Sequence, residues 1–215
     1  KRGSRFKMIN INDLTIAYNS KIIIDHISFE VKDASCVVLF GPSGSGKTSI
    51  LNAIANLIPY SGEIKTDKPS YSFQSPKLFK RLTVLDNLSL VSGNLEKIED
   101  YLVKFKMLEF KNQRADKLSG GQMARVNIIR SLLKNDVLLL DEPFSSLDLA
   151  LKDDVMRILR DEIVSKKGTI LVTHDLEEAL SLGDRMFCLI NGKIEEQDLN
   201  SKLLKEDIIK KLIKW

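Results

Sequence analysis

The sequence contains few of the residues that build disulfide frameworks, and it lacks long apolar runs. Its 215 residues include two cysteines, two histidines and one tryptophan. Cys36 and Cys188 both lie in apolar, strand-like runs, so we expect buried thiols in a reducing compartment rather than a disulfide or a metal pair. No stretch of about eighteen apolar residues occurs, so the chain is not expected to span a membrane. Polar residues interrupt 9–18, which argues against a secretory signal.

The charge pattern also lacks a stripe of one sign. The formal net charge is +4, and acidic and basic residues are interspersed along the chain. A nucleic-acid partner is therefore not predicted, because such binders concentrate lysine and arginine on one face. The length is sufficient to bury a sizeable core in one domain, or in one domain with a lobe.

A phosphate-binding loop is the first motif present. Residues 41–48 read GPSGSGKT and match G-x-x-x-x-G-K-[ST] at every fixed position, between an apolar run at 36–40 and a helical pattern at 49–57. Backbone N–H groups of such a loop can surround phosphate oxygens at a helix N-terminus. Lys47 is expected to reach the β- and γ-phosphates, and Thr48 to bind Mg²⁺. An ordinary Gly/Ser turn is the alternative. The predicted nucleotide-binding residues here are Gly41, Pro42, Ser43, Gly44, Ser45, Gly46, Lys47, Thr48 and Ser49.

Two carboxylates follow a second apolar run. Residues 137–140 are apolar without alternation, which suits a central parallel strand. Asp141 and Glu142 come at its C-terminal end, where open α/β sheets bind ligands. Asp141 is the expected Mg²⁺ partner, and Glu142 is expected to orient or deprotonate the water that attacks the γ-phosphate. An Asp-Glu-Pro turn that merely closes the strand is the alternative.

A glycine-containing pentapeptide lies between these two motifs. It consists of Leu118, Ser119, Gly120, Gly121 and Gln122. A phosphate loop, this pentapeptide and an acidic strand end in that order resemble the ATP-binding cassette (ABC) ATPases, and the resemblance covers nearly the whole chain. In that family the pentapeptide is the signature, which binds the γ-phosphate of an ATP held by a second subunit. Two ATP molecules then join two chains head to tail.

The resemblance assigns roles to four further residues. Tyr18 matches the aromatic residue that stacks on adenine, although local packing at a strand end is an alternative. Gln74 matches the glutamine that touches Mg²⁺ and senses the membrane partner. His174 matches the switch-loop histidine near the γ-phosphate, although a lone histidine after a strand is more often structural. Asp148 belongs to a loop that crosses the dimer interface, in which Ser146 stands where the family usually has alanine.

The predicted fold is an α/β P-loop NTPase with ABC-type architecture. It has a mixed or parallel core sheet with flanking helices, an antiparallel β subdomain and a helical lobe that carries the signature. Alternating residues from 9 to 31 favour the antiparallel strands, and continuous apolar runs from residue 36 onward favour the parallel core. We expect one domain, with a core over 8–74 and 119–198 and a helical lobe over 75–118. Asn56 stands where relatives often have glycine, and a left-handed conformation is expected there.

The predicted function is the ATP-binding and ATP-hydrolysing subunit of an ABC transporter, at the cytoplasmic face of the membrane. Its expected partners are a second copy of itself, transmembrane permease subunits and an extracytoplasmic solute-binding protein. The segment that follows His174 resembles ATPases that drive import of small nutrients of the nitrate, sulfonate, taurine and thiamine-precursor group. The alternatives are an efflux or lipoprotein-release ATPase and a soluble ABC protein outside transport. A plain P-loop kinase would not need the signature.

The two ends of the sequence carry separate expectations. Residues 1–7 read as an expression remnant ahead of Met8. Residues 199–215 form a basic amphipathic pattern, expected to be a helix packed on its own domain, with a membrane surface as the alternative. We expect no C-terminal regulatory domain of the kind found in maltose-type importers.

Overall fold

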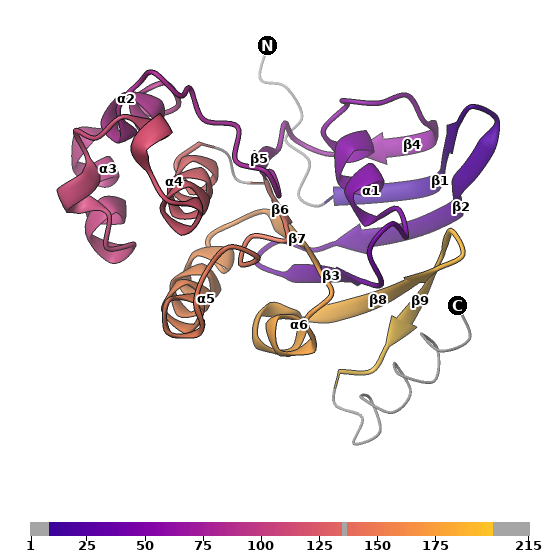
Figure 1. Ribbon diagram of the computed structural model, residues 1–215. Coiled ribbons are helices and arrows are strands. Elements are labelled where there is room, and N and C mark those ends of the chain that lie inside the picture. The colour runs from indigo at the N-terminus through magenta and orange to yellow at the C-terminus, as the bar shows by residue number, and fades with distance from the viewer. Residues whose placement is uncertain (1–8, 135–136, 200–215) are drawn as a thin grey trace, which may run out of the picture.

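The computed structural model describes residues 9–134 and 137–199, which form two sheets and a set of helices (Figure 1). The predictions for 1–7 and, apart from Leu199, for 199–215 lie outside these residues. The strands are β1 (Ile9–Tyr18), β2 (Lys21–Val31), β3 (Cys36–Phe40), β4 (Ser61–Lys65), β5 (Ser70–Ser72), β6 (Val137–Asp141), β7 (Gly168–Thr173), β8 (Arg185–Ile190) and β9 (Lys193–Gln197). The α-helices are α1 (Lys47–Ile54), α2 (Val84–Ser89), α3 (Leu95–Lys104), α4 (Gly120–Leu132), α5 (Leu149–Ile163) and α6 (Leu176–Leu182).

The smaller sheet is antiparallel, with the order β2-β1-β4. Asn19 and Ser20 join β1 to β2 with φ of 48° and 66°, and a two-residue turn with two positive φ values matches the twist of a hairpin. Asp13 also has a positive φ, at an irregularity that shifts the buried side chains from Ile11 to Leu14. The predicted alternating strands are therefore confirmed, with a bulge that alternation alone did not indicate.

The larger sheet has the order β5-β6-β7-β3-β8-β9. Its strands are parallel from β5 through β8, and β9 pairs antiparallel with β8. The β8–β9 turn is Asn191–Gly192, again with positive φ at both residues. The predicted parallel core from residue 36 onward is confirmed.

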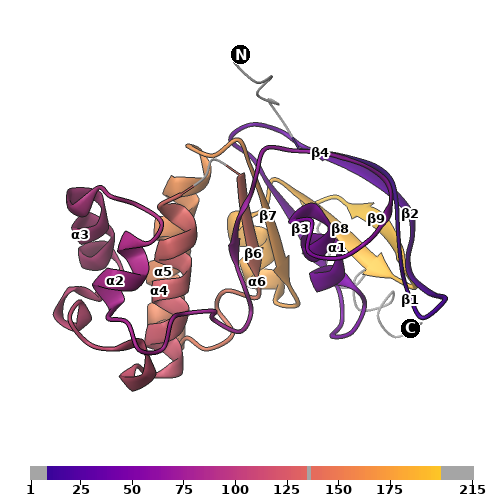
Figure 2. The ribbon, with the colours of Figure 1, turned by 90° about the horizontal axis from the view of Figure 1, so that it is seen from above.

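The core sheet separates two hydrophobic clusters, because successive side chains of a strand point to opposite faces. On one face, residues such as Val38 and Leu140 pack with α2 through α6. On the other, Leu39 and Leu139 pack with α1 and the antiparallel sheet. Figure 2 shows α4 and α5 on one side of β6 and β7, and α1 on the other. Helices thus cover one face, whereas the second face is covered mainly by another sheet.

The segment between β5 and α4 is helical, as predicted. Apart from one isolated bridge between Thr83 and Arg114, the described residues 75–118 contain no β-structure. Side-chain caps fix the first residues of these helices, with Thr83 and Asp86 forming a capping box at α2 and Asn94 capping α3.

Two further predictions concern Asn56 and membrane crossing. Asn56, after α1, has φ of 56°, so its expected left-handed conformation is confirmed. Within 9–134 and 137–199, no helix combines the length and apolar character that a membrane crossing requires.

Replacement of a buried strand leucine tests the double core. Leu139 is fully buried, and Leu139→Ala is expected to lower the free energy of unfolding by about 2–5 kcal/mol through lost burial and a residual cavity. Leu149→Ala is the matched control, because that side chain is 78% exposed, and a change within about 0.5 kcal/mol is expected. Urea unfolding of both variants makes the comparison, and equal losses would contradict the assigned burial.

Candidate functional site

Three loops meet at one edge of the parallel sheet. Phe40 is paired with Thr173, and Asp141 with Val172, so β3, β6 and β7 end at nearly the same level. The loops that follow carry the phosphate-loop sequence, Glu142 and His174. Residues that are far apart in the sequence are thereby brought together at the carboxyl ends of the strands, where open α/β sheets bind ligands.

A cavity of about 290 Å³ opens beside these loops. Tyr18 lies at its edge, 44% exposed, and its Oη donates to Ser49 Oγ at 3.5 Å. The cavity therefore joins the end of β1 to the loop before α1. The lining residues are Tyr18, Ile23, Ser43, Gly44, Gly46, Lys47, Thr48, Ser49, Gln74 and Glu142.

The loop before α1 is shaped by glycine. Gly46 is the N-cap of α1, with φ of 104°, and a Cβ there would lie 2.8 Å from Ile24 Cδ1. Lys47 Nζ donates to the carbonyl oxygens of Gly41 and Pro42 at 2.7 Å each. Burial lowers the pKa of Lys47, and the Glu142 and Asp141 carboxylates oppose that shift. Backbone N–H groups and a cation at a helix N-terminus can bind an anion.

A group of oxygen atoms surrounds Asp141 and includes Thr48, which lines the cavity. Thr48 Oγ1 donates to Asp141 Oδ1 at 3.1 Å, and Tyr71 Oη lies 3.3 Å from Asp141 Oδ2 and 3.2 Å from Asn52 Oδ1. Burial raises the pKa of Asp141, against the effect of the hydrogen bonds from Thr48 and Tyr71. Hydroxyl, carboxylate and amide oxygens are the ligands that Mg²⁺ prefers, so Thr48, Asp141 and the nearby Gln74 can hold that ion.

Glu142 is held between two other predicted site residues. Its side chain is 13% exposed, and Gln74 Nε2 donates to its Oε2 at 3.0 Å. His174 Nδ1 lies 3.3 Å from its Oε1. The backbone φ of Glu142 is 44°, in the left-handed region, which is uncommon for a residue with a side chain and is often seen at functional sites. The structure thus brings Gln74, Glu142 and His174 together beside the cavity.

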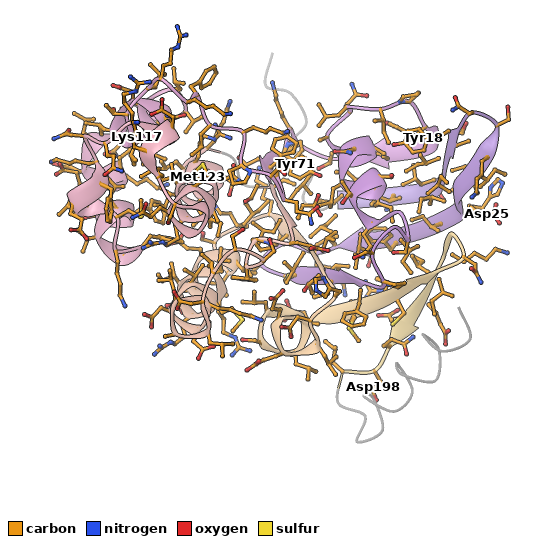
Figure 3. All side chains as sticks on the ribbon, in the orientation of Figure 1. Tyr18, Asp25, Tyr71, Lys117, Met123 and Asp198 are labelled. Atoms are coloured by element: carbon orange, nitrogen blue, oxygen red, sulfur yellow. The ribbon has the colours of Figure 1, made fainter. Side chains whose placement is uncertain are left out.

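The signature lies outside this cavity. Ser119 is the N-cap of α4 and forms a capping box with Gln122, and Leu118 is buried just before it. A Cβ on Gly121 would lie 3.0 Å from the backbone oxygen of Ser146, whereas Gly120 has more space. Figure 3 shows Met123, which follows the signature, on the opposite side of Tyr71 from Tyr18. The pentapeptide therefore contacts the 145–148 loop of its own chain.

Asp148 is also away from the cavity. It caps α5, and its Oδ1 accepts from Leu151 N at 3.0 Å.

The hydroxyl of Ser45 lies inside the phosphate loop. Its Oγ is buried and has no hydrogen-bond partner among the described residues. An unpartnered buried hydroxyl is unusual. A ligand in the loop would supply such a partner.

Sequence reasoning missed three residues that shape the site. Tyr71 contacts Asp141 as described, and Asn127 Nδ2 donates to Ser72 Oγ and to the Phe73 carbonyl at 3.0 Å each. Arg130 Nη1 donates to the carbonyl of Lys77 at 2.7 Å. The chain on both sides of Gln74 is therefore fixed to α4. The available signal was a polar residue within an apolar helical run, as at Asn127 between Val126 and Ile128.

The buried carboxyl of Asp141 leads to a stability prediction. Its pKa is raised in the folded state, so the folded protein binds more protons and its stability falls as pH rises through the window between the unfolded and folded pKa values. Asp141→Asn removes this charge. The variant is expected to be more stable than the wild type at about pH 7.5, by roughly 0.5–2 kcal/mol, with a smaller difference at about pH 5.

Urea unfolding at the two pH values measures this difference. Asp153→Asn, at an exposed position of α5, is the matched control and is expected to show no such pH-dependent gain. A variant that is no more stable than wild type at about pH 7.5 would contradict the prediction.

Comparison with known proteins agrees with this geometry. The family model described as ABC transporter matches residues 24–145. The spermidine/putrescine import ATP-binding protein PotA of Bacillus cereus is 34% identical over 213 residues, covering 88% of this chain and 65% of that protein. The sulfate/thiosulfate import ATP-binding protein CysA of Mycobacterium bovis is 35% identical over 213 residues, covering 87% and 60%.

Solved structures show the same arrangement. The dimeric structure of MJ0796, a bacterial ABC transporter cassette, superposes with a TM-score of 0.82 at 28% identity, covering 90% of this chain and 100% of that chain. A structure of the ATP-binding subunit of an ABC transporter shares the fold at 21% identity, with a TM-score of 0.83 and 94% of each chain covered. The chain spans only about two thirds of the length of the PotA relative, 65%. With its phosphate loop, its signature and a family match over 24–145, the chain belongs to the ABC transporter family.

Proposed function

We propose that this chain is the ATP-binding and ATP-hydrolysing subunit of an ABC transporter that imports a small nutrient. The single observation that carries the proposal is the position of Glu142. Its carboxylate lies beside the cavity of the phosphate loop, within hydrogen-bond distance of Gln74 and His174. A carboxylate so placed can orient and deprotonate a water molecule.

The phosphate loop would hold the substrate ATP. Among the described residues the Ser45 hydroxyl has no hydrogen-bond partner, and the buried Lys47 donates to loop carbonyls, so both support phosphate binding there. Tyr18 at the cavity edge would stack on adenine. The phosphates would contact backbone N–H groups of the loop and the first residues of α1.

Thr48, Asp141 and Gln74 would hold Mg²⁺, which supplies charge neutralisation at the phosphates when bound. The donor set fits that ion, because it consists of a hydroxyl, a carboxylate and an amide within reach of the cavity. His174, whose imidazole lies beside the Glu142 carboxylate, would contact the γ-phosphate. Glu142 would accept the proton of the attacking water. In the hydrolysis step, Glu142 would thus act on the water, and His174 on the phosphate that the water attacks.

The signature and Asp148 would act in a dimer. The signature begins a helix, and a helix N-terminus attracts an anion, yet residues 118–122 do not line the cavity of their own chain. In a head-to-tail pair, residues 118–122 of one copy would cover the ATP held by the other copy. ATP binding would close the pair, and hydrolysis with phosphate release would open it.

Import is supported by the relatives, which are named as import ATP-binding proteins for polyamines and for sulfate or thiosulfate. These cargoes differ from each other and from the nitrate, sulfonate, taurine and thiamine-precursor group, so the cargo of this chain is not assigned. Permease subunits and an extracytoplasmic solute-binding protein are the proposed partners, with this chain at the cytoplasmic face of the membrane. The core would comprise 8–74 and 119–198, with 75–118 as the helical lobe.

The role of Glu142 is tested by Glu142→Gln. This variant is expected to bind ATP but to lose at least about 100-fold in turnover, because it cannot accept a proton. It is also expected to accumulate as an ATP-bound dimer, measured by light scattering after gel filtration. Lys47→Ala is expected instead to lose ATP binding itself, measured by nucleotide titration.

Glu63→Gln provides the matched control, since it removes the same charge from an exposed residue of β4. Its turnover and ATP affinity are expected to stay at the wild-type level. Near-normal turnover of Glu142→Gln would show that Glu142 is not the catalytic carboxylate.

The partner proposal is tested by isolation from gently solubilised membranes followed by mass spectrometry. A polytopic membrane protein is expected to accompany the chain, because the cassette must pass its closure to a permease. A soluble binding protein in the same complex supports import. Recovery with a permease alone favours the efflux reading, and recovery with soluble partners alone contradicts the transporter reading.

A further inference from the structure

A charge cluster with a buried ammonium joins α5 to the segment that follows His174. Lys152, on α5, has a side chain only 10% exposed. Its Nζ lies 2.5 Å from Asp175 Oδ2 and 2.8 Å from Glu178 Oε1. The Glu178 side chain is 8% exposed. Asp175 is more open, with 37% of its side chain exposed. Charges as buried as those of Lys152 and Glu178 are retained only when they are paired, so these two groups depend on each other, and Asp175 adds a second carboxylate to the same ammonium.

The cluster fixes the backbone on both sides of His174. Asp175 N donates to Thr173 Oγ1 at 3.0 Å, and the Thr173 hydroxyl in turn bonds to Glu178. Asp175 uses its second oxygen, Oδ1, to cap α6 by accepting from Glu177 N at 2.8 Å. Residues 173 and 175 are therefore both tied to the same buried ammonium, directly or through Glu178.

The imidazole of His174 has little other support. Its side chain is 58% exposed, and Glu142, 3.3 Å away, is its one recorded hydrogen-bond partner among the described residues. The direction of the ring toward Glu142 is consequently set by the backbone that carries it. Any movement of residues 173–175 would move the ring relative to the Glu142 carboxylate.

We propose that Lys152 is a positioning residue for His174. It holds the loop at the end of β7 against α5, so that the imidazole meets Glu142. Because Asp148 caps α5, the same ammonium connects the 145–148 loop, which contacts the signature, to the loop of His174. In its kinetic part, the inference rests on the proposed ATP hydrolysis.

A role confined to docking α5 against α6 predicts different behaviour. Loss of the cluster would then lower stability but leave the His174 ring and the turnover per folded molecule unchanged. The experiment therefore needs a readout of His174 itself as well as a kinetic one.

The kinetic experiment compares Lys152→Met with Lys152→Arg in the full chain. Lys152→Met is expected to lower kcat by about 10- to 100-fold with little change in the KM for ATP, because a group displaced by a small distance loses that much. Lys152→Arg, which keeps the charge, is expected to recover most of kcat. Lys167→Met is the matched control, since it breaks the part-buried ion pair with Asp67 away from the site.

A double-mutant cycle shows whether the effect passes through His174. If it does, Lys152→Met adds little further loss of kcat in a His174→Ala background, because the two changes remove the same contribution. Losses that multiply fully would overturn the proposal. Near-normal turnover of His174→Ala alone would instead contradict the proposed role of His174 in ATP hydrolysis. The positioning of the His174 ring by Lys152 would then be decided by the imidazole NMR spectrum.

That readout is the imidazole NMR spectrum, which is simple because the chain has two histidines. His26 lies in β2, bonded to Asp13, and serves as the internal reference. Lys152→Met is expected to shift the His174 signal and leave the His26 signal unchanged, and Lys152→Arg to restore it. Asp175→Asn, which can still cap α6, is a milder second variant if Lys152→Met does not fold. An unshifted His174 signal in a folded variant overturns the inference.

Discussion

The common level at which β3, β6 and β7 end is the constraint on which the site depends. Parallel pairing sets Phe40 beside Thr173 and Asp141 beside Val172. Each strand is buried on both faces, so a slip of one residue would exchange its two sets of apolar side chains between the two cores. The packing that stabilises the sheet therefore also fixes where the phosphate loop, Glu142 and His174 meet. Hydrophobic burial supplies the stability, and the polar groups at the strand ends inherit their positions from it.

The motifs and the fold could be predicted because their signals are local. GPSGSGKT requires glycine at positions such as Gly46, whose φ of 104° excludes ordinary side chains, and the apolar run before Asp141 has the pattern of a central parallel strand. Two features were not predictable by the same means. The covering of one sheet face by a second sheet depends on long-range packing, and β9 follows a short turn without a strong apolar pattern. The roles of individual site residues and the division into a core and a lobe stay predictions.

The supporting residues of the site were missed for a related reason. Tyr71, Asn127 and Lys152 belong to no short motif, and each acts through a partner distant in the sequence, such as Asp141, Phe73 or Asp175. A single sequence shows that such a residue is polar in an apolar surrounding, but it does not show which group it meets. Motifs thus identified the groups near the cavity, whereas the groups that hold them in place became visible only through the fold.

The site also contains local features that cost stability. Asp141 is a carboxyl whose pKa is raised by burial, Ser45 has a buried hydroxyl with no partner in the part of the chain that the structure describes, and Glu142 has a left-handed backbone. Each is unfavourable in the isolated chain, and such features persist only where the surrounding packing determines them. Bound ions would relieve two of them, since an anion in the loop would satisfy the Ser45 hydroxyl and a cation beside Thr48 would neutralise Asp141. The energetic cost of this sheet edge therefore supports the proposal that a charged ligand binds there, and the absence of residues 118–122 from the cavity lining is consistent with the proposed role of a second copy in enclosing it.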